Sequence, residues 1–376
     1  DFSSSVEREY IFSHMYQQVK DKFYDKSLHG VDWDKYTAEY RRFLPYISND
    51  IDFAEMLSEV LGELNASHTG GRAYTNTPAL EETAFLGAFF DDTYTGDGLK
   101  VSEIIARGPI AIKANAIKAG DIITAIDGTQ IKAGEDYFPL LSGKAGERVR
   151  ITVAHSDGKS SDYTVKPVDS GANRSLLYKR WVERNQKVTD SISGGKIGYV
   201  HIQGMDSPSF RTIYDEVLGR YRNCDAIIVD TRYNGGGWLH NDVALLFNGK
   251  KYVDYMPRGQ YIGSDPFSQW TKPSAMLINE SNYSDAHGTP YVYKTLGIGK
   301  LIGAPVPGTM TAVWWENQIN PAIVFGIPQV TSVDVNGNVL ENQQLNPDIL
   351  IYNQPNEFLN GTDAQLIEAI KSLMSK

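Results

Sequence analysis

The chain lacks the features that mark several large classes of protein. A single cysteine among 376 residues, Cys224, excludes an internal disulfide and any metal site built from several cysteines. No stretch comes near the roughly 18–20 consecutive apolar residues that a membrane-spanning helix needs. The formal net charge is −10, and no run of lysine and arginine is long enough to follow a phosphate backbone. These absences argue against a disulfide scaffold, a membrane span and a nucleic-acid partner.

Metal and cofactor motifs are missing as well. There is no HExxH motif or similar pair of histidines, and GIGK at 297–300 lacks the other residues of a phosphate-binding loop. We therefore expect neither a metal nor an organic cofactor. The N-terminus, DFSSSVEREY, has no initiator methionine and no signal-peptide features, so we expect a mature form or a piece of a longer protein. Bacterial or archaeal cytoplasm and bacterial periplasm both stay open as compartments.

Three kinds of hydrophobic periodicity follow one another along the chain. Up to residue 66, apolar residues recur at steps of three and four, which predicts a helical bundle. From about 84 to 168, short β-like runs such as DIITAIDG alternate with turns that contain glycine and aspartate. From about 190, buried-strand runs such as DAIIV and SAMLI alternate with amphipathic helices, which is typical of an α/β domain. We place the three domains at 1–75, 76–170 and 171–376.

The middle segment has a recognisable motif. AIKAGDIITAIDGTQI, residues 116–131, resembles the segment that closes the sheet in PDZ domains. PDZ domains bind an extended peptide as an added strand. A small β-domain without a binding role is the alternative.

Three consecutive glycines follow the apolar run DAIIV, in DTRYNGGGWLH at 230–240. Ligands usually bind where parallel strands end, and glycines let a substrate backbone approach closely. Their N–H groups can then point at an oxyanion that develops during a reaction. An ordinary tight turn is the alternative.

Ser284 lies in SNYSDAHGTP, between the run SAMLI and a predicted helix. The N–H of Asp285, at the start of this helix, would point into the same space as the glycines and would favour negative charge there. The local sequence is not GxSxG, so the nucleophile turn of α/β-hydrolases is disfavoured. Ser281, three residues earlier, is the alternative nucleophile. Either serine needs a base to take its proton.

Seven histidines are candidates for that base. His68 is favoured because it lies in LNASHTGG, among small and polar residues rather than in an apolar stripe. His287 shares a helical face with Ser284, but Ser-Asp-Ala-His is more typical of a helix start at which Ser or Asp caps. The remaining histidines lie in an amphipathic helix, before a turn, in a strand and in loops: His14, His155, His201, His29 and His240.

Together the motifs resemble the core of tricorn protease, within the family of tail-specific, or C-terminal processing, serine peptidases. The resemblance runs along the chain through FYDKSLHGVDWDKY, LNASHTGG, the PDZ-like segment, DTRYNGGG, NESNYSDAHGTP and ENQQLNPDI. It implies an α/β multidomain fold with an N-terminal helical bundle, a PDZ-like β-domain and a crotonase-like α/β catalytic domain. The implied partners are peptide or polypeptide substrates. Whether the chain forms a homo-oligomer, and whether further N-terminal domains precede it, stays open.

The resemblance also implies a catalytic tetrad. Ser284 would be the nucleophile and His68 the general base. Ser67 would orient the histidine, and Glu341 would polarise Ser67. This order is chemically sensible because a base beside a nucleophile works best when a third group fixes its tautomer.

The oxyanion hole implied by the resemblance consists of the N–H groups of Asp285 and of Gly236 or Gly237. The Ser/Lys pair of the other branch of the family is disfavoured, because Thr309 and Met310 stand where the lysine is expected. Two alternatives remain: a binding protein on the same scaffold without turnover, and acyl-CoA chemistry of the crotonase kind. The filled tetrad positions argue against the first, and a PDZ-like insert is unexplained by the second.

Overall fold

The computed structural model describes residues 4–74, 82–111 and 116–375. The chain forms two compact units, one from residues 1–76 with 186–376 and the other from residues 77–185. A helical N-terminal region, an antiparallel β-domain and an α/β domain with a parallel sheet are all present, as the sequence predicted. The predicted boundary between residues 75 and 76 lies outside the described residues, and the boundary at 170 stays a prediction.

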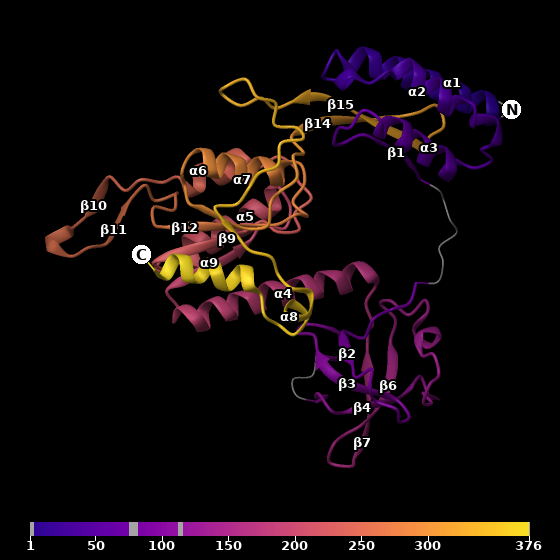
Figure 1. Cartoon of the computed structure of the whole chain (residues 1–376). Helices are drawn as coiled ribbons and strands as arrows, with labels where there is room; N and C mark the ends of the chain where they lie inside the picture. Colours follow the sequence, from indigo (N-terminus) through magenta and orange to yellow (C-terminus); the bar gives the residue numbers. More distant parts are fainter. Residues whose placement is uncertain (1–3, 75–81, 112–115, 376) are drawn as a thin grey trace. The chain divides into compact units, whose positions relative to one another are not determined.

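The α/β domain is built on a five-stranded parallel sheet in the order β16-β13-β12-β9-β8. Its central strands β12 and β9 are labelled in Figure 1. Its strands are β8 (Ile197–His201), β9 (Ala226–Asp230), β12 (Ser274–Ile278), β13 (Lys300–Gly303) and β16 (Ile349–Leu350). Every residue of β9 and β12 is buried. Continuous apolar runs such as these are expected of strands that are covered on both faces.

Helices cover both faces of this sheet. On one face lie α5 (Ser207–Asp215) with its π-helical continuation Glu216–Arg220, α6 (His240–Phe247) and α7 (Asp285–Thr295). Their apolar side chains share one core with alternate residues of the strands, among them Ile227, Val229 and Met276. On the other face, α9 (Ala364–Met374) packs against β9, β12 and β13, below the sheet in Figure 1. Two further helices are the long α4 (Ser170–Ser193) and the short α8 (Pro355–Leu359).

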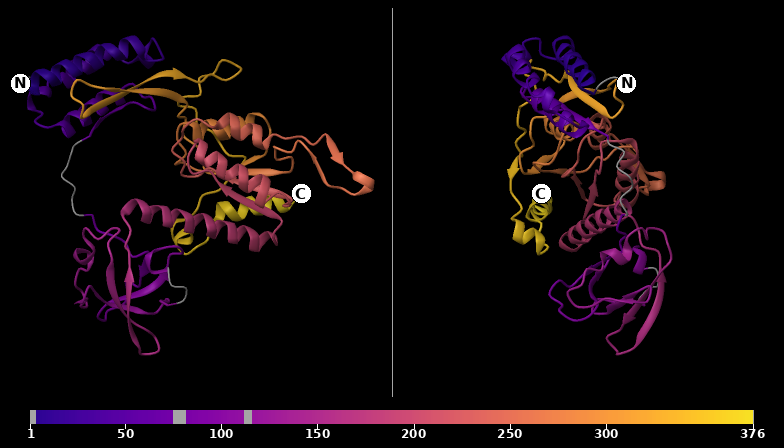
Figure 2. Two further views of the ribbon diagram at one scale, coloured as in Figure 1. Left: turned by 180° about the vertical axis from the view of Figure 1, so that it is seen from behind. Right: turned by 90° about the vertical axis from the view of Figure 1, so that its right-hand side faces the viewer.

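The N-terminal helices are α1 (Ser4–Lys22), α2 (Trp33–Arg41) and α3 (Asp50–Gly62). They pack beside a three-stranded antiparallel sheet of β1 (Gly70–Ala73), β15 (Ile323–Thr331) and β14 (Thr311–Asn317), as both views of Figure 2 show. Ile323, Phe325 and Ile327 of β15 are buried in the same core as the helices. The helical prediction is confirmed, but the sheet that completes this core was not predicted, because β14 and β15 come from a distant part of the chain.

The second unit is an antiparallel β-domain in the order β2-β3-β4-β6-β7, with β5 paired to β4. Its strands are β2 (Ala88–Phe90), β3 (Leu99–Ile104), β4 (Ile122–Ile126), β5 (Thr129–Gln130), β6 (Val149–Ala154) and β7 (Ser160–Val165). The run DIITAIDG contains β4, whose Ile123 and Ile126 are buried in the core of the unit.

One hairpin projects from the α/β domain in Figures 1 and 2: β10 (Val253–Tyr255) paired with β11 (Gly263–Asp265). Short 3₁₀ helices complete the structure at Leu28–Gly30, Leu44–Tyr46, Pro109–Ala111, Phe138–Leu141 and Pro257–Gly259. Within the described ranges, no helix has the length and apolar character needed to cross a membrane.

Candidate active site

Three loops leave the same edge of the parallel sheet. The glycine loop follows β9, the segment that leads to Ser284 follows β12, and the segment that leads to Thr309 follows β13. Since β9, β12 and β13 are parallel neighbours, their carboxyl ends meet at this edge. The first two loops are joined directly, because the backbone N–H of Tyr283 donates to the carbonyl of Asn234 at 3.0 Å.

Ser284 has an unusual backbone for a residue with a side chain. Its φ is 57° and its ψ is −125°, at the position just before α7. Such conformations cost free energy and persist only where the surroundings hold them. Here the N–H of Ser284 donates to Thr309 Oγ1 at 2.8 Å. The Ser284 hydroxyl makes no hydrogen bond with any residue in the described ranges and does not cap α7, so it is available to a bound molecule.

The glycine loop lies against Ser284 and requires glycine at two positions. A Cβ atom on Gly236 would lie 2.5 Å from Ser284 Cβ, and one on Gly237 would lie 2.1 Å from the carbonyl oxygen of Met205. Both glycines also have positive φ, at 100° and 140°. The Gly236 N–H donates to Asn234 Oδ1 at 2.8 Å. By contrast, the N–H groups of Gly237 and Asp285 have no hydrogen-bond partner in the part of the chain that the structure describes.

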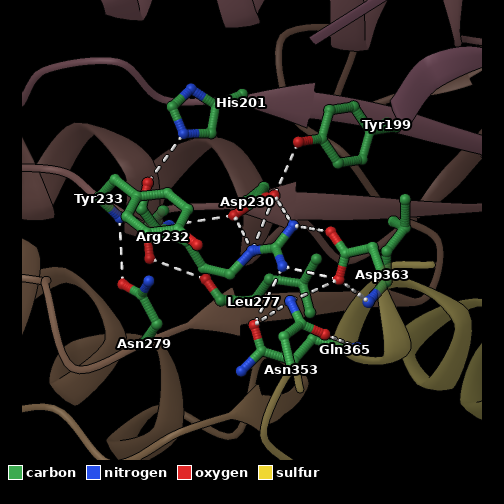
Figure 3. A network of polar contacts seen from close by, with 12 residues as sticks. Tyr199, His201, Asp230, Arg232, Tyr233, Leu277, Asn279, Asn353, Asp363 and Gln365 are labelled. Carbon is green, nitrogen blue, oxygen red and sulfur yellow. Dashed lines mark hydrogen bonds and ion pairs between the residues drawn. The ribbon is translucent and has the colours of Figure 1, made fainter. Parts of the chain in front are cut away.

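A buried ion-pair network holds the start of the glycine loop (Figure 3). The Arg232 guanidinium, which is fully buried, bonds Asp230 at 2.7 Å and Asp363 at 2.9 Å. Burial acts to raise the pKa of Asp230, but the adjacent Arg232 holds it below its usual value. The Asp363 carboxylate also accepts the N–H of Leu366 in the first turn of α9. Arg232 therefore ties the glycine loop to the C-terminal helix.

A chain of hydrogen bonds connects Glu341, Ser67 and His68. The Ser67 hydroxyl lies 2.8 Å from His68 Nδ1 and donates to Glu341 Oε2 at 3.0 Å. The Ser67 backbone N–H donates to the other carboxylate oxygen at 2.5 Å. Burial lowers the pKa of His68. Burial raises the pKa of Glu341, and the hydrogen bonds from Ser67 and from the backbone of Met310 oppose that rise.

His68 lies next to the residue that precedes Ser284. Its backbone N–H donates to Tyr283 Oη at 2.8 Å, and the two rings pack with their centroids 4.7 Å apart. The structure contains no hydrogen bond between the His68 imidazole and the Ser284 hydroxyl, both of which it describes. Such bonds are often long without substrate and shorten in the complex with it. The four predicted tetrad residues thus belong to one compact unit. Tyr283, which contacts His68, directly precedes Ser284 in the chain.

His287, the alternative base, is held in a different role. It is buried, and its Nδ1 accepts the backbone N–H of Thr309 at 3.2 Å. Burial lowers the pKa of His287 to about 4, so the ring is neutral at neutral pH. Because Thr309 in turn accepts the N–H of Ser284, His287 supports the backbone of Ser284 from below.

Asp285 caps a helix, but not the helix that the sequence indicated. Its carboxylate accepts the backbone N–H groups of Leu239 at 2.5 Å and of His240 at 3.0 Å, so it caps α6 rather than α7. It also bonds His240 Nδ1 at 2.5 Å, and this bond raises the pKa of His240. Expected capping of α7 by Ser or Asp side chains is therefore wrong. The sequence placed His240 only in a loop, and nothing in its local context indicated the contact with Asp285.

Within the described residues, no group of three or more histidine, cysteine, aspartate or glutamate side chains is arranged to hold a metal ion.

Comparison with known proteins agrees with the geometry. The model for peptidase family S41 matches residues 196–351, that for the tricorn protease C1 domain matches residues 4–62, and that for the tricorn protease PDZ domain matches residues 93–170. Tricorn protease homolog 1 of Streptomyces coelicolor is 28% identical, over 94% of this chain and 34% of the relative. Tricorn protease of Thermoplasma acidophilum is 25% identical, over 99% of this chain and 35% of the relative. The chain thus spans about a third of the length of these relatives.

Among solved structures, the crystal structure of the tricorn protease superimposes with a TM-score of 0.88 at 24% identity, covering 99% of this chain and 37% of that one. This likeness shows that the folds agree. The chain has a multidomain α/β fold, with a helical region that matches the C1 domain, a β-domain that matches the PDZ domain, and an α/β domain on a parallel sheet that matches the S41 peptidase model. Residues 196–351 match peptidase family S41, a family of serine peptidases, and the domains along the chain are similar to those of the C-terminal region of tricorn protease. The predicted resemblance to the tricorn protease core and the predicted fold class are confirmed.

Proposed function

We propose that this protein hydrolyses peptides or unfolded polypeptides through an acyl-enzyme on Ser284. His68 is the general base and acid, and Ser67 and Glu341 orient it. The N–H groups of Gly237 and Asp285 form the oxyanion hole. No step in this mechanism calls on a metal or an organic cofactor.

The proposed reaction has two halves. In the first, Ser284 Oγ attacks the carbonyl carbon of the scissile peptide bond while His68 Nε2 takes the hydroxyl proton. The oxyanion accepts hydrogen bonds from Gly237 and Asp285, and the intermediate collapses as His68 returns the proton to the leaving amine. In the second half, His68 takes a proton from water, which attacks the acyl ester. The acid product then leaves, and the proton on His68 returns to Ser284.

The observation that carries the proposal is the hydrogen-bond chain from Glu341 through Ser67 to His68 Nδ1. A hydrogen bond to Nδ1–H leaves Nε2 as the nitrogen able to accept a proton, so the chain selects the tautomer that a base needs. This base packs on Tyr283, beside a serine whose backbone is held in a strained conformation. Gly237 is favoured over Gly236 as the oxyanion donor, because the Gly236 N–H already donates to Asn234.

The direct test is covalent labelling. We expect a fluorophosphonate to add one phosphonyl group to Ser284 and a peptide chloromethylketone to alkylate His68, as measured by intact mass and peptide mapping. A folded protein that neither reagent modifies would favour the binding protein without turnover. Labelling of Ser281 instead would support the proposed peptidase activity but would make Ser281, not Ser284, the nucleophile.

The rate of acylation should depend on the protonation of His68. Only the neutral imidazole can take a proton, and burial, by disfavouring the imidazolium, lowers the pKa of His68 from the usual 6.5. Falling pH therefore inactivates the enzyme only below the unperturbed value, and kcat/KM should rise with pH along a limb whose midpoint lies below 6.5. The pH profile of acylation measures this midpoint. His14→Gln is the control: His14 is far from Ser284 in sequence and is paired with Glu316, so this change should leave the midpoint of the pH profile where it is. A midpoint above 6.5 would contradict the assignment of His68 as the base.

The glycine loop offers a matched pair of variants. Gly237→Ala should reduce kcat by about 10²–10³-fold, the usual cost of losing one oxyanion donor, because a Cβ there collides with Met205. Gly235→Ala is the control, since a Cβ at Gly235 meets nothing within 4 Å. Steady-state kinetics and thermal unfolding should be measured on both. If both variants fold and have equal kcat values, the assignment of the Gly237 N–H to the oxyanion hole is wrong.

A further inference from the structure

Two hydroxyl groups, not one, lie beside His68 Nδ1. Thr311, the first residue of β14, has its Oγ1 atom 3.0 Å from His68 Nδ1 and 2.9 Å from Ser67 Oγ. Ser67 Oγ itself is 2.8 Å from His68 Nδ1. These three atoms form a triangle in which every side has the length of a hydrogen bond. Thr311 is buried, so water does not compete freely for these positions.

The protons can be assigned from the surrounding acceptors. A carboxylate only accepts, so the Ser67 hydroxyl donates to Glu341 Oε2 at 3.0 Å and keeps its lone pairs for other donors. The Thr311 hydroxyl has two acceptors for its proton, Ser67 Oγ at 2.9 Å and the backbone carbonyl of Ser67 at 3.3 Å. Its lone pairs are then also open to a donor. The N–H at His68 Nδ1 consequently faces two oxygens that can accept from it.

We propose that Thr311 is a second positioning residue for His68, sharing with Ser67 the hydrogen bond from Nδ1. The inference rests on the proposed function, and it assigns a task to a residue outside the implied tetrad. Ser67 is the acceptor connected to Glu341, whereas Thr311 is connected to the backbone. An imidazolium that forms during acylation therefore keeps one acceptor when the other is removed.

Thr311 also lies in a segment that can fix the position of His68 relative to Ser284. It pairs with Thr331 in the β14–β15 ladder, so its Cα position is fixed by the sheet. Two residues earlier, Thr309 accepts the N–H of Ser284 at 2.8 Å. One short segment thus contacts both His68 and Ser284. A side chain that replaces Thr311 must therefore have a similar shape, because a change in this segment would disturb both His68 and Ser284.

A double-mutant cycle tests the shared role. Ser67→Ala and Thr311→Val each remove one hydroxyl, and we expect each to lower kcat about tenfold with little change in KM. The double variant should lose about 10³–10⁴-fold, more than the product of the single losses, because the imidazole then has no acceptor that fixes its tautomer. Thr311→Ser retains the hydroxyl and should have nearly the wild-type kcat, which mere packing of the threonine methyl would not explain.

Labelling of wild-type Ser284 by the fluorophosphonate is measured first, so that failure of the proposed function is seen before any variants are compared. With that label present, the inference is overturned if Thr311→Val equals the wild type and the double variant equals Ser67→Ala. It is equally overturned if Thr311→Ser loses as much as Thr311→Val. Thermal unfolding of each variant identifies any that fail to fold. If Thr311→Val does not fold, Thr311→Ser and the double variant Ser67→Ala/Thr311→Ser are compared instead.

Discussion

Replacing Ser284 by alanine is expected to lower kcat by about 10⁴–10⁶-fold, as removal of the nucleophile does in serine peptidases with a hydrogen-bonded base. The residual rate would come from binding and from the proposed oxyanion donors Gly237 and Asp285. Stability should hardly change, because the Ser284 hydroxyl makes no hydrogen bond with any residue in the described ranges. Peptide hydrolysis, fluorophosphonate labelling and urea unfolding of the same preparation measure all three quantities.

Ser281→Ala is the matched control for this variant. Ser281 is exposed in the turn before Ser284, and its backbone N–H, which alanine keeps, donates to Asn279 Oδ1 at 3.3 Å. We expect Ser281→Ala to retain nearly full activity and labelling. Loss of activity in Ser281→Ala with retention in Ser284→Ala would mean that the peptidase uses the other serine.

Arg232→Met should cost about 3–5 kcal/mol of unfolding free energy, the usual cost of removing one partner of a buried ion pair. Methionine fills part of the space but leaves the carboxylates of Asp230 and Asp363 buried beside it without their cation (Figure 3). Since Arg232 joins the glycine loop to α9, we also expect kcat to fall. Chemical denaturation, with kcat measured well below the unfolding transition, separates the two effects.

The control for the buried arginine is an exposed one on the same domain. Arg211 lies on the solvent side of α5, and Arg211→Met should change the unfolding free energy by no more than about 0.5 kcal/mol. If Arg232→Met and Arg211→Met have the same unfolding free energy, the ion pairs of Arg232 do not stabilise the fold as a buried ion pair is expected to. Adding Asp230→Asn and Asp363→Asn to Arg232→Met should recover part of the loss, because neutral amides are less costly to bury than carboxylates.

Local patterns in the sequence were sufficient for much of the fold. Buried strands appear as continuous apolar runs, and amphipathic helices repeat with the period of the helix, so β9, β12 and the helices α1, α3 and α9 follow from a few neighbouring residues each. The positions of Ser284 and of the glycine loop in the fold were predictable for the same reason. Both directly follow a recognisable strand, and neighbouring parallel strands bring their carboxyl ends together.

The partners of these residues were not predictable from local patterns. The resemblance implied the roles of Ser67 and Glu341, but Thr311 beside His68 carries no local sign of its position. Asp285 was expected to cap its own helix, and the fold instead directs its carboxylate to the N-terminus of α6. The sheet that completes the N-terminal core likewise pairs strands from opposite ends of the chain.

By itself the sequence determined the order of domains, the serine and its glycine loop, and the absence of any cysteine framework or metal motif. Tertiary structure decided which groups surround them: the second hydroxyl at His68, the backbone strain at Ser284, and the buried arginine below the loop. The physical reason is that periodicity and turn chemistry act between near neighbours. Hydrogen bonds and ion pairs in a buried site join residues that only the packing of distant elements brings within 3 Å of one another, as Glu341 and Ser67 are.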